Sequence, residues 1–231
     1  IIICSLFLTM LIFGPLFMLP SVLGKDYQGI NIIPFGSDAH AYLTRAREVL
    51  DGHKLGSPFI KEGKNEVDSL VSYSDYILLA PIKLLGLTQR VNIVTLYYIY
   101  AFIGVFFLII LIYFFVWQLA GDKLLSIAAA LFAIGGYSII YHKALFYHDF
   151  NVYARLIYPY VSSLILFFYL NLLIKSLRSD KLKYKIFAGL VFGLMFYIYF
   201  FTWTFTLVFS ASLLLVYIIK KDFLSAKKML L

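Results

Sequence analysis

The chain has 231 residues, of which 62% are hydrophobic and only 14% are charged, and its mean hydropathy is +0.89. Soluble domains are roughly half apolar and about a quarter charged, so this composition excludes an ordinary soluble protein and indicates a membrane protein. The net charge of +8 falls mainly on short loops between apolar runs. It therefore indicates membrane orientation and attraction to anionic lipid, and gives no reason to expect a nucleic-acid partner.

The apolar runs predict an all-α, polytopic membrane protein with about six transmembrane helices. These runs cover residues 1–23, 91–119, 124–141, 156–174, 186–201 and 203–219. Only Thr202 separates the last two runs, which predicts a tight helical hairpin or one long broken span. The polar residues at their far ends, 178–181 and 220–222, favour the hairpin. We expect one transmembrane module over 1–231, with an inner basic segment at 220–231. The first and last residues lie in apolar sequence, so we also expect an N-terminal fragment of a longer protein.

Lysine and arginine in the short loops predict the orientation. The loops 175–185 and 220–231 hold nine basic residues and two acids, whereas 142–155 holds two basic residues, Lys143 and Arg155. Positive loops stay inside, so we expect a multi-pass protein of the cell membrane with its N-terminus inside. The long loop 24–90, with eight basic and eight acidic residues, is then outside together with 142–155.

The long outer loop is expected to contain short helices. Residues 38–51 have helical periodicity, with Ser37 or Asp38 as a plausible N-cap and Gly52 as the stop. The expected apolar face of this helix consists of Ala39, Tyr42, Ala46 and Val49. The run 76–87 is too short for a span and contains a proline and a lysine, so it predicts an interfacial or re-entrant helix.

Asp38 is the first candidate for chemistry, because a helix N-terminus favours the ionised carboxylate. A simple capping role for Asp38 remains the alternative. The run G-S-D-A-H-A-Y-L-T-R-A-R-E-V-L-D-G follows one span and precedes a re-entrant stretch and further spans. This layout resembles the GT-C superfamily of integral membrane glycosyltransferases, and distantly the catalytic subunits of oligosaccharyltransferases. The resemblance implies a functional acid at Asp38, with His40, Tyr42 and Arg45 in supporting positions.

The second outer loop offers His148, Asp149 and Arg155. Carboxylate and imidazole groups could bind a divalent cation, and an aromatic belt at the interface is the alternative for this loop. Arg155 could contact a phosphate with its planar guanidinium, or it could only anchor the helix at the interface. The paired acids that the oligosaccharyltransferase resemblance implies in this loop are not clear, because Asp149 stands alone.

The resemblance implies an enzyme that moves a sugar from a polyprenyl-phosphate or polyprenyl-diphosphate donor to an acceptor on the outer face. The acceptor, a glycan, lipid or protein, stays open. Asp38 would be the general base, or it would hold a Mg or Mn ion, with Asp149 as a second metal ligand. Arg155 would bind the donor phosphate. A transporter or flippase, or a non-catalytic subunit of a membrane complex, is the alternative.

Overall fold

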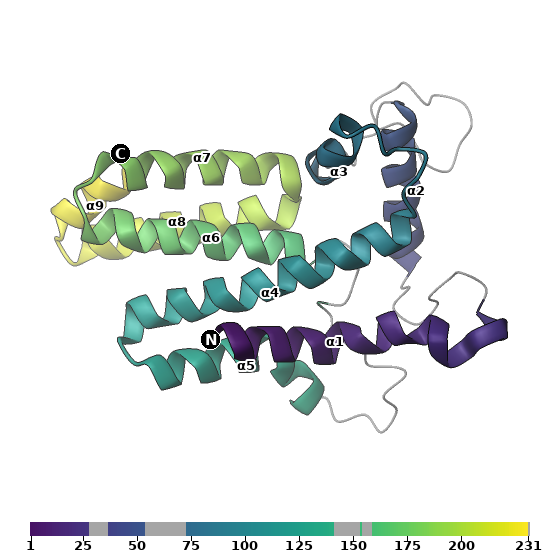
Figure 1. The fold of residues 1–231 in the computed structure, drawn as a ribbon. Coiled ribbons are helices and arrows are strands. Elements are labelled where there is room, and N and C mark those ends of the chain that lie inside the picture. Colours follow the sequence, from purple (N-terminus) through teal and green to yellow (C-terminus); the bar gives the residue numbers. More distant parts are fainter. Residues whose placement is uncertain (28–36, 54–72, 141–152, 154–158, 231) are drawn as a thin grey trace. The chain divides into compact units, whose positions relative to one another are not determined.

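The computed structural model describes residues 1–27, 37–53, 73–140, 153 and 159–230. In this part of the chain every regular element is a helix (Figure 1). The elements are α1 (Ile2–Leu23), η1 (Gly24–Asp26), α2 (Ser37–Asp51), α3 (Ser74–Leu84), α4 (Ile93–Ala120), α5 (Lys123–Ile140), α6 (Tyr160–Arg178), α7 (Leu182–Ile198), α8 (Phe200–Ile219) and α9 (Phe223–Leu230). The prediction of an all-α membrane protein is confirmed.

Four helices in the described residues are long and apolar enough to cross a bilayer. They are Ile2–Asp26, Ile93–Ala120, Tyr160–Arg178 and Phe200–Ile219. The last of them exposes most of its apolar surface, since only 11% of its most apolar stretch is buried. An apolar surface of this extent is unfavourable in water and favourable against lipid acyl chains. The helices are therefore those of a membrane protein.

The described residues therefore contain four candidate spans and not the expected number of about six. The runs predicted over 124–141 and 186–201 do form helices, α5 and α7, but neither qualifies as a span among the described residues. α7 has 17 residues, about 26 Å of helix against a hydrocarbon core of about 30 Å. The break between the last two predicted runs also lies at Tyr199, where the backbone is extended (φ −156°, ψ 127°), and not at Thr202.

The chain divides into two compact units. Unit 1 comprises residues 1–107 and 131–161, and unit 2 comprises 108–130 and 162–231. In unit 1, Phe13 and Phe17 of α1 meet Phe102 of α4 edge to face, with ring centroids 6.0 and 6.1 Å apart. Unit 1 also contains α2 and α3, which pack on each other.

Unit 2 is a helix bundle whose members share polar as well as aromatic contacts. Asn171 of α6 donates a hydrogen bond of 2.9 Å to the carbonyl of Leu111 in α4, and its own Oδ1 accepts one from Gln118. Tyr169 of α6 stacks at a tilt against Phe192 of α7, with ring centroids 5.9 Å apart. These side chains link α6 to its neighbours without placing an uncompensated charge in the bilayer.

Buried hydroxyl groups inside the spans bond to their own helix. Thr9 donates to the carbonyl of Ser5 at 2.7 Å, and Thr206 donates to the carbonyl of Thr202, also at 2.7 Å. A polar group in lipid must find a partner within the protein. The carbonyl one turn earlier is the nearest acceptor that a helical threonine can reach.

The helix predicted over 38–51 is confirmed as α2, which begins one residue earlier, so Ser37 and Asp38 lie in its first turn and not at the predicted N-cap position. Ala46 and Val49 of its expected apolar face are completely buried. Gly52 ends the helix at a φ of 90°, which a residue with a Cβ rarely adopts. His53 N–H then bonds to the carbonyl of Glu48 at 3.0 Å and Gly52 N–H to that of Val49 at 3.3 Å, the pattern of a Schellman C-cap.

Candidate functional site

A buried ion pair joins α2 to α3 and to the first turns of α4. Arg45 Nη2 of α2 lies 3.0 Å from Asp75 Oδ2 of α3. The hydroxyl of Tyr97 in α4 donates a hydrogen bond of 3.0 Å to the other oxygen, Asp75 Oδ1. Both carboxylate oxygens of Asp75 are therefore engaged, each by a different helix. We call Arg45, Asp75 and Tyr97 the buried triad; all three lie in unit 1.

Burial of the triad costs solvation free energy, because it removes charged and polar groups from water. The side chain of Asp75 is 1% exposed and that of Arg45 is 14% exposed, while Tyr97 is completely buried. Burial raises the pKa of Asp75, and this outweighs the Arg45 charge and the Tyr97 hydrogen bond, which lower it. Asp75 also occupies the first turn of α3, where the helix dipole favours a negative charge.

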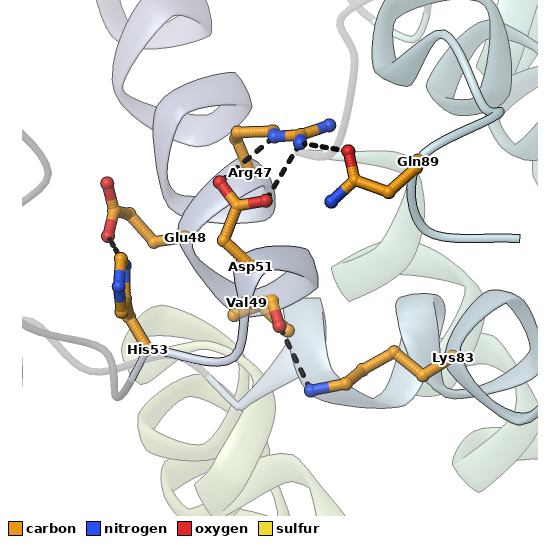
Figure 2. Close-up of polar contacts among 7 residues, drawn as sticks. All are labelled: Arg47, Glu48, Val49, Asp51, His53, Lys83 and Gln89. Atoms are coloured by element: carbon orange, nitrogen blue, oxygen red, sulfur yellow. Dashed lines mark hydrogen bonds and ion pairs between the residues drawn. The ribbon is translucent and has the colours of Figure 1, made fainter. Parts of the chain in front are cut away.

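A second set of contacts fixes the other end of α2, as Figure 2 shows. Lys83 of α3 donates a hydrogen bond of 3.0 Å from Nζ to the carbonyl of Val49, in the last turn of α2. Arg47 contacts Asp51 through two nitrogens, at 3.0 and 2.8 Å, and reaches Gln89 beyond α3 at 3.2 Å. A cation at a helix C-terminus is favourable because the last carbonyls carry partial negative charge.

His53 closes this end of the helix. Its Nδ1 lies 2.6 Å from Glu48 Oε2 (Figure 2). The partner is one turn back on the same helix, and the histidine is about half exposed, so this contact stabilises the C-cap and adds no contact to α3.

The contacts in the middle and at the C-terminal end of α2 also restrict the position of its first turn. Arg45, Val49 and Arg47 hold the helix from its middle to its C-terminus, and Asp38 is seven residues before Arg45. A rise of 1.5 Å per residue puts Asp38 about 10 Å from Arg45 along the helix axis. Asp38 is thus carried in the first turn of a helix that is anchored further along by a buried charge pair.

The structure brings together only some of the predicted site residues. Arg45 lies in the buried triad, and Tyr42 is half-buried on the same helix. Asp38 and His40 lie in the first turn of α2, but their side chains are outside the described part. His148, Asp149 and Arg155 lie outside the described residues altogether.

A metal centre is not present among the side chains that the structure describes. They contain no group of three or more histidine, cysteine, aspartate or glutamate residues able to hold an ion. The two acids proposed as metal ligands, Asp38 and Asp149, fall outside that set, so the cation stays a prediction.

Sequence reasoning missed two of the three members of the triad, Asp75 and Tyr97. The signal for Asp75 was its position: one acid directly before the apolar run 76–87. An acid that begins an otherwise apolar helix is rarely left without a cationic partner. Tyr97 gave no comparable signal, since the chain has 19 tyrosines and many suit a membrane interface.

Comparisons with known proteins give one partial match. No protein-family model matches the chain, and no solved structure matches it. The 5'-nucleotidase SurE of Campylobacter fetus subsp. fetus (strain 82-40) is 38% identical to it over 72 residues. This match covers 29% of the chain and 28% of the nucleotidase. The similarity is confined to that segment and does not show a family.

Proposed function

We propose that this protein is a membrane glycosyltransferase that moves a sugar from a polyprenyl-phosphate or polyprenyl-diphosphate donor to an acceptor on the extracytoplasmic face. The observation that supports it best is the anchoring of α2 by the buried triad. Asp38, the acid that the GT-C resemblance marks as functional, is in the first turn of this helix. Catalytic groups act best when a rigid element holds them in place.

The position of the buried triad near one end of a candidate span suits a lipid-linked substrate. Tyr97 is the fifth residue of α4, a helix long enough to span the bilayer, so the triad is tied to the first turns of a span. A polyprenyl donor keeps its chain in the bilayer and its phosphate at the headgroups. A reaction site near the end of a span would meet both parts of the donor.

Each residue has a separate part in the proposed reaction. Asp38 accepts the proton of the acceptor hydroxyl as general base, with His40 and Tyr42 nearby on the same helix. Arg155 binds the donor phosphate through its guanidinium. Arg45 is assigned to positioning, because its guanidinium is already paired with Asp75.

The proposal includes a divalent cation, Mg²⁺ or Mn²⁺, bound beside the donor phosphate. Carboxylate oxygens are suitable ligands for such ions, and Asp38 with Asp149 are the residues that would hold it. The cation would supply charge neutralisation at the phosphate. Transfer measured with and without a chelator tests this part separately.

The test of the function is radiolabelled sugar transfer from polyprenyl-linked donors, in membranes that contain this protein. Asp38→Asn keeps the size of the side chain but removes its charge. We expect transfer to fall by at least about 100-fold, the scale of a lost general base. The matched control is Asp51→Asn at the exposed end of the same helix, which should transfer normally. Equal activity in Asp38→Asn and the control would remove the catalytic role from Asp38.

We further propose that the N-terminus lies inside and that the α2–α3 region lies outside. The support is the excess of basic residues in 175–185 and 220–231. Cys4 is the only cysteine, so a Cys4→Ser background allows single cysteines to be labelled by an impermeant reagent. Cysteines at Ser57 and Lys181 should label from opposite sides, and labelling from the same side contradicts this topology.

A further inference from the structure

The end of unit 2 where α8 finishes contains a tight reversal. α8 ends at Ile219, and the chain turns at Lys221, whose backbone has a left-handed φ of 57°. Asp222 Oδ1 then accepts a hydrogen bond of 3.1 Å from the N–H of Ser225, in the first turn of α9. A side-chain acceptor before the helix is an N-cap, so the start of this short helix is built into the sequence.

α9 is also fixed to the loop between α6 and α7 (Figure 1). Lys228 Nζ lies 2.8 Å from Asp180 Oδ1 and donates a hydrogen bond of 3.3 Å to the carbonyl of Leu177. Leu177 is in the last turn of α6, where an unpaired carbonyl favours a cation. One lysine thus brings α9 and the α6–α7 loop together.

This docking gathers exposed positive charge on one surface, which we call the basic face. It consists of Arg178, Lys181, Lys183, Lys220, Lys221 and Lys227, all exposed. The two acids in these segments are both engaged, Asp180 with Lys228 and Asp222 with the N-terminus of α9. Their hydrogen bonds lower the pKa of each, so both stay ionised in neutral solution. Nine basic residues against two acids still leave the segments strongly positive.

Apolar side chains accompany the charge. Phe223 and Leu224 of α9 are 65% and 68% exposed, while Ala226 on the same helix is buried. A short helix with exposed aromatic and aliphatic groups beside lysines is typical of a segment that lies in the interface plane of a membrane. The basic face adjoins the ends of two candidate spans, α6 and α8, which is the level of the lipid headgroups.

We propose that the basic face binds the headgroups of acidic phospholipids in the leaflet that borders it, with Phe223 and Leu224 inserted at the boundary with the acyl chains. A soluble polyanion would also be attracted by lysines, but it would leave these two apolar side chains in water. A phospholipid satisfies the charge and the apolar surface together, because its phosphate and its acyl chains meet at this depth. This inference does not depend on the proposed glycosyl transfer.

The experiment uses the full chain in vesicles of phosphatidylcholine and phosphatidylglycerol, with bromine on the acyl chains of one lipid or the other. Trp117 and Trp203, the two tryptophans of the chain, are replaced by Phe, and Phe223→Trp places the fluorophore on α9. Bromine quenches tryptophan that it contacts, so the two brominated mixtures report which lipid surrounds α9. We expect brominated phosphatidylglycerol to quench at least about twofold more strongly at equal mole fraction.

Three variants and a change of salt concentration make the result specific. The reduced-charge variant Lys220→Gln/Lys221→Gln/Lys227→Gln removes half of the basic face and should weaken the preference, whereas the corresponding Lys→Arg variant should keep it and so controls for folding. The matched control, Lys25→Gln/Lys123→Gln, removes lysines outside the basic face and should keep the preference. Salt should weaken the preference, because the screening length falls from about 10 Å at 0.1 M to about 3 Å at 1 M.

Equal quenching by both brominated lipids would overturn the proposal. So would a preference of undiminished size in the reduced-charge variant. Loss of the preference on adding a stoichiometric RNA oligonucleotide or acidic peptide would show that a soluble polyanion takes the face more readily than lipid, and would overturn it as well.

Discussion

The buried triad makes a quantitative prediction about how firmly α2 is held. Arg45→Met keeps the aliphatic stem of the side chain but removes the guanidinium, so Asp75 loses the partner at 3.0 Å. Arg47→Met is the matched control. It breaks an ion pair on the same helix, at 2.8 Å from Asp51, but the two side chains there are 41% and 32% exposed.

The burial of each ion pair sets the free energy that its removal should cost. Two unit charges 3.0 Å apart attract by about 5 kcal/mol at an effective dielectric of about 20. Much of this attraction only offsets the cost of taking the ions out of water, but removal of one partner of a buried pair costs about 3–5 kcal/mol. Arg45 keeps some solvent contact and Asp75 can take up a proton, so we expect about 3 kcal/mol. An exposed pair such as Arg47–Asp51 contributes less than about 1 kcal/mol.

Amide hydrogen exchange of peptides from α2, followed by mass spectrometry, measures this difference, because exchange reports the free energy of local opening. Arg45→Met should speed exchange in α2 by roughly 100-fold, since each 1.4 kcal/mol is a factor of about ten. Arg47→Met should change it by less than about fivefold. If the two variants exchange alike, the buried pair does not hold the helix.

Three further predictions concern other parts of the molecule. Gly104→Ala should lower the thermal midpoint of the protein in detergent, because a Cβ there would lie 2.5 Å from a ring carbon of buried Tyr160; an unchanged midpoint would mean that the ring moves aside freely. Burial raises the pKa of Asp75, so the folded state binds its proton more tightly than the unfolded state. Protection of α2 should therefore increase as the pH falls from the raised pKa toward the ordinary value of 3.8, and Asp75→Asn should remove this dependence. Arg155→Lys should raise the Michaelis constant for the lipid-linked donor with membrane insertion unchanged, because lysine lacks the planar fork of a phosphate clamp; equal donor dependence would leave Arg155 an interfacial anchor.

The helices were predictable from the sequence where one physical rule dominates. α2 could be placed within one residue because an apolar periodicity and a glycine stop agree over 38–52. α1 and α4 were predictable because each lies in an apolar run that is long enough to span a bilayer. The division at Tyr199 could not be placed, because the aromatic run from Tyr197 to Phe201 suits a helix throughout.

The partnership within the site was not predictable. Arg45 was noted as a neighbour of Asp38, yet its partner Asp75 is thirty positions away and follows a segment without periodicity. A single sequence does not show which distant acid an arginine will meet. The burial that makes the pair significant is a property of the packed helices, and neither residue type indicates burial when taken alone.

Asp38 and Arg45 have different proposed tasks on one helix, and the two tasks can be separated by experiment. Asp38→Asn should reduce sugar transfer by at least about 100-fold while exchange in α2 changes by less than about fivefold, because a charge in the first turn of a helix contributes only about 0.3–1 kcal/mol. Arg45→Met should speed exchange and reduce transfer together, because a helix that opens more often holds Asp38 in place less of the time. Arg45→Lys restores a cation opposite Asp75 and should recover part of both. Fast exchange in Arg45→Met with undiminished transfer would show that the triad fixes α2 for a reason unrelated to the reaction.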